Sequence, residues 1–254
     1  MSFIQRMLSS VGIGAASVDT ILSTDTFTQG EMMNGTVIVR GGNVEQKIDE
    51  IYLSVKTIYK SKSDDVKSTG DLAKYKLATG FVIGPNETKE LPFSFRLPYH
   101  TPITTMGRTR IWLETGLDIK SALDPSDQDS IRVAPSRLLQ ALLQATEQLG
   151  FRIRQVEVEA APYHMSGVSP IVQQFEYVPY SGEFRGKLDE FEIVPIVEEH
   201  QVTVFMEIDR RARDLGGLFA EMLDVDETRV RLTYTEQDLP NLSHMLYQQL
   251  SQYS

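Results

Sequence analysis

Short segments of alternating apolar and polar residues recur along the first half of the chain, from Ala15 to Val133. Clear examples are GTVIVRGG (35–42), KIDEIYLSVKTIYKSKSDD (47–65) and TRIWLETGLDI (109–119). Alternation at every second residue places the apolar side chains on one face of a β-strand. Turn signals separate these segments at intervals of about 8–12 residues or somewhat more. Because no segment with a helical period interrupts them, the pattern predicts an antiparallel sandwich and disfavours βαβ folds.

One strand of this series is enclosed by prolines, in the stretch ELPFSFRLP (90–98). Phe93, Phe95 and Leu97 alternate with Ser94 and Arg96, which predicts a strand with one buried and one solvated face. Proline has no backbone N–H, so it is typical of strand ends and sheet edges. We expect the three apolar side chains to pack between the two sheets of the sandwich.

The pattern changes after Pro135. SRLLQALLQATEQLG (136–150) has leucines at helical spacing, Ser136 as N-cap and Gly150 past the end. Strand-like segments follow at 151–159, 171–180, 187–197, 201–210 and 228–234, with helical patterns at 211–224 and 238–254. Asp238 is the expected N-cap of the last helix. The predicted organisation is a first β-domain over 1–135, a junction helix over 136–150 and a second β-sandwich-like domain over 151–254.

Charge is distributed unevenly along the chain, whose net charge is −10. Residues 1–133 hold 15 Lys and Arg against 16 Asp and Glu, whereas residues 134–254 hold 10 against 19. The acidic second half argues against nucleic-acid binding and favours either a self-repelling solvated surface or a docking face for a basic partner. The absence of Cys excludes disulfides and thiolate sites and fits a reducing cytoplasm.

The first residues, MSFIQRMLSSVGIGAAS, lack the continuous apolar core of a signal peptide. Ile4, Met7, Leu8 and Val11 fall on one face of a short predicted helix. With a single basic residue, this helix is expected to make weak or no membrane contact.

No known catalytic motif occurs in the chain, so we expect no enzyme activity, no catalytic residues and no cofactor. The four histidines are too far apart in sequence to suggest a metal site. Asp124, Asp127 and Asp129 in DPSDQD (124–129) are oxygen ligands of the kind that Ca²⁺ prefers. The spacing lacks the central glycine and final Glu of an EF-hand, so an Asp-rich turn without metal is the prediction.

A charged cluster, IDRRARD (208–214), lies at a predicted strand-to-helix junction. Arg pairs readily with carboxylates, so one interpretation is a solvated turn and the other is an ion-pair network between domains. The residues of this hypothetical network are Asp118, Asp124, Asp209, Arg210, Arg211 and Arg213.

The last helix has an apolar face that contains Leu242, Leu246, Leu250 and Tyr253. Two interpretations stay open. The face either packs on its own domain or serves as a docking or dimerisation surface, which would make the protein a homodimer.

Two motifs resemble the N-terminal domain of arrestins: FTQGEMMNGTVIV (27–39) and LPFSFRLP (91–98). The chain as a whole, including TGLDIKSALDPSDQD and FMEIDRRARDLGGLFAEMLD, is similar to the bacterial sporulation-control protein M family. This resemblance implies a mainly β fold with two arrestin-like β-sandwich domains joined through the mid-chain helix and short extra helices in the second half. It also implies a non-enzymatic cytoplasmic regulator of sporulation, with links to cell division and morphology.

Three functions are therefore compared. The first is a regulatory scaffold that binds other proteins, for which division or cytoskeletal proteins are candidate partners. The second is a peripheral trafficking-type adaptor that contacts the membrane through its N-terminal helix. The third is an ion- or ligand-responsive sensor with DPSDQD as its switch.

Overall fold

The computed structural model describes residues 15–61, 66–105, 109–119, 124–161, 169–210 and 228–254. The chain forms two compact units. The first unit comprises residues 1–58, 69–98 and 110–133, and the second comprises 59–68, 99–109 and 134–254. The second unit thus includes two short segments from the first half of the chain, 59–68 and 99–109. The domain ranges predicted from the sequence are contiguous and do not include these segments in the second domain.

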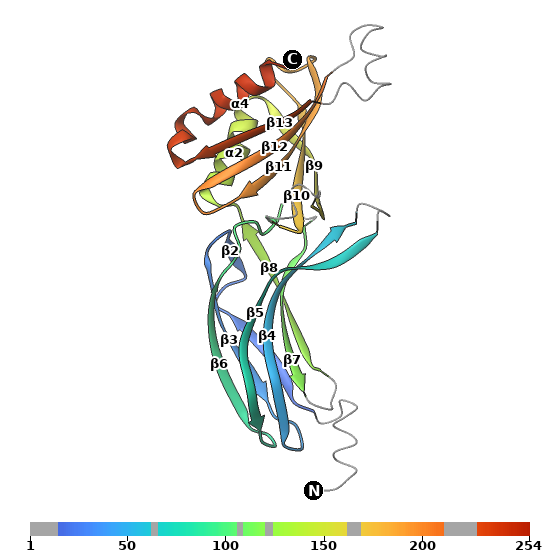
Figure 1. Ribbon diagram of the computed structural model, residues 1–254, viewed down its shortest axis with the longest axis vertical. Helices are drawn as coiled ribbons and strands as arrows, with labels where there is room; N and C mark the ends of the chain where they lie inside the picture. The colour runs from blue at the N-terminus through green and yellow to red at the C-terminus, as the bar shows by residue number, and fades with distance from the viewer. Residues whose placement is uncertain (1–14, 62–65, 106–108, 120–123, 162–168, 211–227) are drawn as a thin grey trace. The chain divides into compact units, whose positions relative to one another are not determined.

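Two antiparallel sheets build the first unit (Figure 1). One has the strand order β1-β3-β6, with β1 at Ser17–Leu22, β3 at Met32–Arg40 and β6 at Thr88–Arg96. The other has the order β5-β4-β7-β8-β2. Its strands are β2 (Thr26–Thr28), β4 (Gln46–Lys60), β5 (Lys67–Ile83), β7 (Ile111–Ile119) and β8 (Ser126–Ala134). The two-sheet sandwich predicted from the alternation is confirmed.

The core of the first unit consists of the apolar half of each alternating strand. Phe93 and Phe95 are each 8% exposed and Leu97 is fully buried. Phe95 stacks on Tyr75 at a centroid distance of 4.0 Å. The Phe93 ring lies over Gly35, where a Cβ atom would come within 2.7 Å of it. Gly35 is therefore needed because only hydrogen leaves room for this ring.

The position of Pro92 explains why a proline is tolerated in this strand. The Leu97 amide donates to the Glu31 carbonyl, and the Leu97 carbonyl accepts from Gly30, so Leu97 points its backbone groups toward β3. Alternate residues point the same way, which leaves Pro92 with its backbone directed away from β3. The Arg96 carbonyl, also directed outward, accepts from the Tyr75 hydroxyl at 2.8 Å. Pro92 thus removes an outward donor from an edge strand without breaking a ladder bond.

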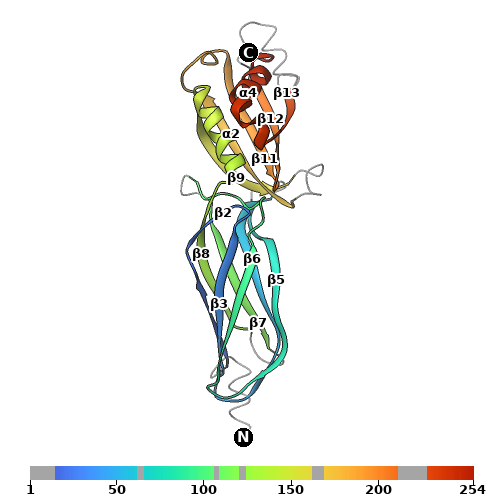
Figure 2. The same ribbon diagram turned by 90° about the vertical axis from the view of Figure 1, so that its left-hand side faces the viewer.

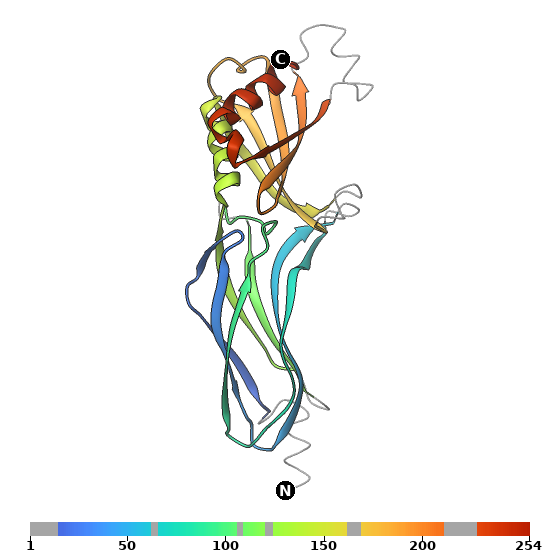
Figure 3. The same ribbon diagram turned by 60° about the vertical axis from the view of Figure 1, so that its left-hand side comes forward.

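A single antiparallel sheet of neighbouring strands β9 to β13 forms the framework of the second unit. The strands are β9 (Phe151–Ala160), β10 (Ile171–Pro179), β11 (Leu188–Val197), β12 (Gln201–Arg210) and β13 (Thr228–Thr235). Helices α2 (Arg137–Gln148) and α4 (Leu242–Ser251) lie side by side on one face of this sheet (Figures 2 and 3). These two helices take the place that a second sheet has in the first unit.

The ends of α2 are as predicted. The Ser136 hydroxyl accepts from the Leu139 amide, and Gly150 follows the helix with a φ of 87°. The start of the last helix differs from the prediction. A 3-10 turn (Glu236–Asn241) precedes α4, and Thr235 is its N-cap. Asp238 accepts from the Thr235 amide at 2.8 Å, because it is the third residue of a capping box rather than the cap.

The predicted helices at the N-terminus and at 211–224 lie outside the described residues. The expected mainly β class is confirmed, since the described residues form thirteen strands and the helices of the second half are additions to them.

Candidate functional site

The predicted ion-pair network is only partly within the described chain. The Asp124 carboxylate, which precedes β8, accepts from the Ile119 amide at 3.0 Å. Asp118 lies in β7, and Asp209 and Arg210 end β12. The side chains of Asp209 and Arg210, and all of Arg211 and Arg213, lie outside the described residues, so this network stays a prediction.

The Asp-rich run is not a turn, which corrects that prediction. Residues from Ser126 onward belong to β8, because this segment pairs with β7 in the register Thr115 to Asp127. The Asp127 carboxylate accepts a hydrogen bond from the Thr20 amide at 2.8 Å. This bond satisfies a backbone N–H on the outer side of the edge strand β1. The carboxylates of this run therefore serve backbone groups. The described residues contain no group of three His, Asp or Glu side chains placed to hold a metal ion.

Asp129 is the exception in this run. One of its carboxylate oxygens is buried without a hydrogen-bonding partner among the described residues. Burial raises the pKa of Asp129 to about 6, and the charge and hydrogen bond of Asp127 and the charge of Asp19 act in the same direction. The buried position disfavours the ionised form of this carboxyl group.

The leucines on the apolar face of α4 pack on their own unit, as the first of the two interpretations predicts, and dimerisation of the protein stays a prediction. Leu242 is 1% exposed, and Leu246 and Leu250 are fully buried. They pack toward α2 and the sheet, while Tyr253 is half-buried near the end of the helix. Burial against α2 leaves no leucine on this face available to a partner.

The opposite face of the same sheet has no helix over it in the described part of the unit (Figure 3). Glu176 of β10 lies directly opposite Glu192 of β11, which lies directly opposite Glu207 of β12. Their neighbours along each strand, such as Phe175, Ile193 and others, are buried beneath the helices, so the glutamates point to the other face. We call these three residues the glutamate row.

Basic and amide side chains interact with this row. Arg154 forms ion pairs with Glu176 and Glu190, and its own side chain is 51% exposed. The Gln174 amide donates to Glu192 at 2.5 Å. Like charges directly opposite on adjacent strands destabilise a sheet. Glu176, Glu192 and Glu207 are thus like-charged neighbours, and in the strand register the row continues to Arg229 of β13, which lies directly opposite Glu207.

A half-buried aromatic residue lies beside the row. Phe205 of β12 points to the same face, and the guanidinium of Arg231 lies 5.6 Å from the centre of its ring. The face thus combines acidic and aromatic groups, a composition suited to basic and apolar side chains of another protein.

Sequence reasoning did not single out the glutamate row, although a signal exists. Each glutamate stands between two apolar residues, in FEY (175–177), FEI (191–193) and MEI (206–208). Alternation predicts that each faces away from the core. Only the strand register shows that the three are direct neighbours.

The membrane hypothesis rests on N-terminal residues outside the described chain. Among the described helices, none combines the length and the apolar character needed to cross a bilayer.

Three comparisons with known proteins identify the same family. The SpoOM protein family model matches residues 4–212. The sporulation-control protein spo0M of Bacillus subtilis (strain 168) is 39% identical over 259 residues, covering 100% of both chains. The crystal structure of Spo0M from Bacillus subtilis covers 95% of this chain and 100% of its own, with a TM-score of 0.83 and 38% identity. This structural match is consistent with the arrestin-like sandwich that the motifs indicated, and the chain belongs to the SpoOM protein family.

Proposed function

We propose that this protein is a non-enzymatic cytoplasmic regulator of sporulation that acts by binding other proteins. The relative that matches it over its full length is named a sporulation-control protein, which supports the process. The proposed mechanism, binding of another protein, is supported by the surface of the second unit, where the glutamate row lies on the sheet face opposite the helices.

The glutamate row is the observation that carries this proposal. Glu176, Glu192 and Glu207 are half-buried, and Glu176 is only 12% exposed at its side chain. Partly buried charges interact more strongly than fully solvated ones. A basic segment of a partner brings positive charge beside these three carboxylates, which favours its binding. The partner expected from this chemistry is a protein with clustered Lys or Arg.

The test is cross-linking of the tagged full chain in its native cells, followed by mass spectrometry. A variant with Glu176→Gln, Glu192→Gln and Glu207→Gln is compared with wild type. We expect the triple variant to lose the specific partner and to sporulate abnormally, while remaining folded by circular dichroism.

A matched control removes the same charge elsewhere. Glu45, Glu90 and Glu199 are exposed and lie outside the row. The control variant, in which these three residues are changed to Gln, should capture the same partner as the wild-type protein. Capture of the same proteins by the row variant, at an unchanged yield, would show that another surface binds them.

A further inference from the structure

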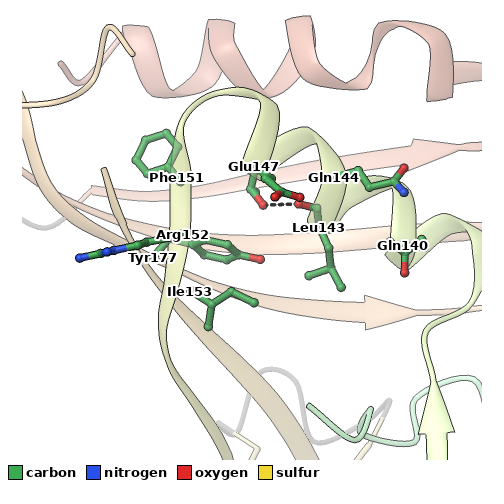
Figure 4. Close-up of a pocket in the computed structure, with 9 residues that line it drawn as sticks. Gln140, Leu143, Gln144, Glu147, Phe151, Arg152, Ile153 and Tyr177 are labelled. Carbon is green, nitrogen blue, oxygen red and sulfur yellow. Dashed lines mark hydrogen bonds between the residues drawn. The ribbon is translucent and has the colours of Figure 1, made fainter. Parts of the chain in front are cut away.

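The second unit contains a cavity between the C-terminal half of α2 and the first two strands of its sheet (Figure 4). Its volume is about 280 Å³. Gln140, Gln144 and Glu147 are exposed on α2 and form its rim. Leu143, Thr146, Phe151, Ile153 and Tyr177 lie deeper, with Arg152 at the β9 side. The interior is therefore mainly apolar and the entrance polar, as in small-molecule sites.

Tyr177 brings an unused polar group into this cavity. The residue is 2% exposed, and its hydroxyl makes no hydrogen bond of ordinary geometry among the described residues, although the Thr146 side chain interacts with it. The neighbouring Thr146 hydroxyl donates its own proton to the Leu143 carbonyl at 2.8 Å. A buried hydroxyl without a hydrogen bond of ordinary geometry is costly, and native proteins rarely keep one without a use.

Regular alternation along β10 sets the direction of Tyr177, which faces the same side of the sheet as the buried Phe175. The irregularity lies in the neighbouring strand β9, where Glu176 pairs with Gln155 and Tyr177 with Ile153, so that Arg154 is the extra residue. The ring is held by stacking on Phe191 at a centroid distance of 5.1 Å, so the hydroxyl has a fixed position. In Figure 4 the hydroxyl and the Arg152 side chain extend in opposite directions.

Tyr234 provides an internal comparison. It is 1% exposed on the same face of the sheet, but its hydroxyl donates to the Leu138 carbonyl at 2.9 Å. Two buried tyrosines thus face the same helix, and only the one at the cavity lacks a hydrogen bond of ordinary geometry within the described structure.

Burial raises the pKa of Tyr177 to about 12, and a weak hydrogen bond with the Thr146 side chain acts in the opposite direction. The hydroxyl is consequently protonated throughout the physiological range and has a proton to donate. The complementary group on a ligand is an acceptor oxygen.

We infer that this cavity binds a compact, uncharged, largely apolar molecule whose carbonyl or ether oxygen accepts a hydrogen bond from Tyr177. The volume is near the lower limit of ligand pockets, which restricts the ligand to a small molecule. The charged side chains do not favour an ion. Glu147 is exposed at the rim, and the Arg152 guanidinium lies 4.9 Å from the centre of the Tyr180 ring.

Two probes of similar shape test this assignment. Acetophenone has the acceptor oxygen and ethylbenzene lacks it. Dissociation constants for both are measured by ligand-observed NMR with the full chain as wild type and as Tyr177→Phe. We expect both probes to bind the wild type, and the variant to bind acetophenone about three- to tenfold more weakly, with ethylbenzene unchanged.

Two further variants locate the effect. Ile153→Trp fills the cavity and should abolish binding of both probes, whereas Tyr234→Phe should bind both as wild type does. Circular dichroism checks that each variant is folded. The inference is overturned by an absence of binding in folded wild type, by acetophenone affinity that is unchanged in Tyr177→Phe, or by binding that survives in Ile153→Trp.

Discussion

The two units differ in how exposed backbone groups are satisfied and in where acidic side chains lie. In the first unit, the outer edges of the small sheet are occupied by side chains or lack a donor. Asp127 bonds the outward Thr20 amide of β1, and Pro92 has no amide to present from β6. In the second unit, by contrast, three glutamates lie directly opposite one another on the sheet face that no described helix covers. This difference is the reason that we propose the binding surface on the second unit and not on the first.

The largest effect expected concerns the core of the first unit. Phe93→Ala should cost about 3–5 kcal/mol, because it removes a buried ring and leaves a cavity above Gly35. The single tryptophan, Trp112, lies in β7 and is 5% exposed, so its fluorescence reports unfolding of the first unit in urea. Ser94→Ala, on the other face of the same strand, should change stability by less than about 0.5 kcal/mol. Equal losses in both variants would contradict the assigned faces.

A smaller effect is expected from the helix-covered face of the second unit. Tyr234→Phe should destabilise this unit by about 1 kcal/mol, since the hydrogen bond to the Leu138 carbonyl is lost. Tyr177→Phe should cost nothing or stabilise slightly, because its hydroxyl makes no hydrogen bond of ordinary geometry among the described residues. Urea denaturation followed by far-ultraviolet circular dichroism, which is sensitive to α2 and α4, compares the two. A greater loss in Tyr177→Phe would reverse our reading of the two hydroxyls.

The glutamate row offers a change that stabilises while it impairs binding. Glu192→Gln keeps an oxygen for Gln174 but removes the central charge, and should raise stability by about 0.2–1 kcal/mol. The gain should shrink as salt is added, because ions screen the repulsion. Thermal unfolding at low and high salt measures it, with Glu199→Gln as control. A loss of stability at low salt would mean that the row does not oppose folding.

The smallest effect expected is dependent on pH and belongs to the first unit. The raised pKa of Asp129 means that its protonated form is favoured in the folded state. Its contribution to stability is present below about pH 4 and is lost as the pH rises through about 6. Asp129→Asn should therefore raise the fluorescence-detected Tm at pH 7.5 by no more than about 2 °C and leave it unchanged at pH 4.

Asp25 supplies the opposite case for this pH experiment. Hydrogen bonds from Arg132 and Thr26 lower the pKa of Asp25, so its contribution is present at neutral pH and is lost in acid. Asp25→Asn should lower the Tm at pH 7.5 slightly, because the ion pair with Arg132 is lost. A variant of Asp129 that behaves in the same way would show that its carboxyl is stabilised as the anion.

Local rules succeeded where neighbouring residues alone control the structure. The leucine spacing, Ser136 and Gly150 together determine α2, because capping and amphipathic packing depend on residues within one or two turns. The same rules misassigned DPSDQD, since its aspartates favour a turn in isolation. Pairing with β7 extends a strand through these residues, and that contact is invisible in the local sequence.

By itself, the sequence determined which residues face inward: alternation placed Phe93, Phe95 and Leu97 in a core, and helical spacing identified the apolar stripe of α4. These assignments depend on backbone periodicity, which is a local property. Only the tertiary structure showed that the apolar stripe of α4 packs on its own unit and that three glutamates far apart in sequence are neighbours. It also showed that the Tyr177 hydroxyl makes no hydrogen bond of ordinary geometry among the described residues. Register and packing bring together residues far apart in the chain, so no local pattern contains them.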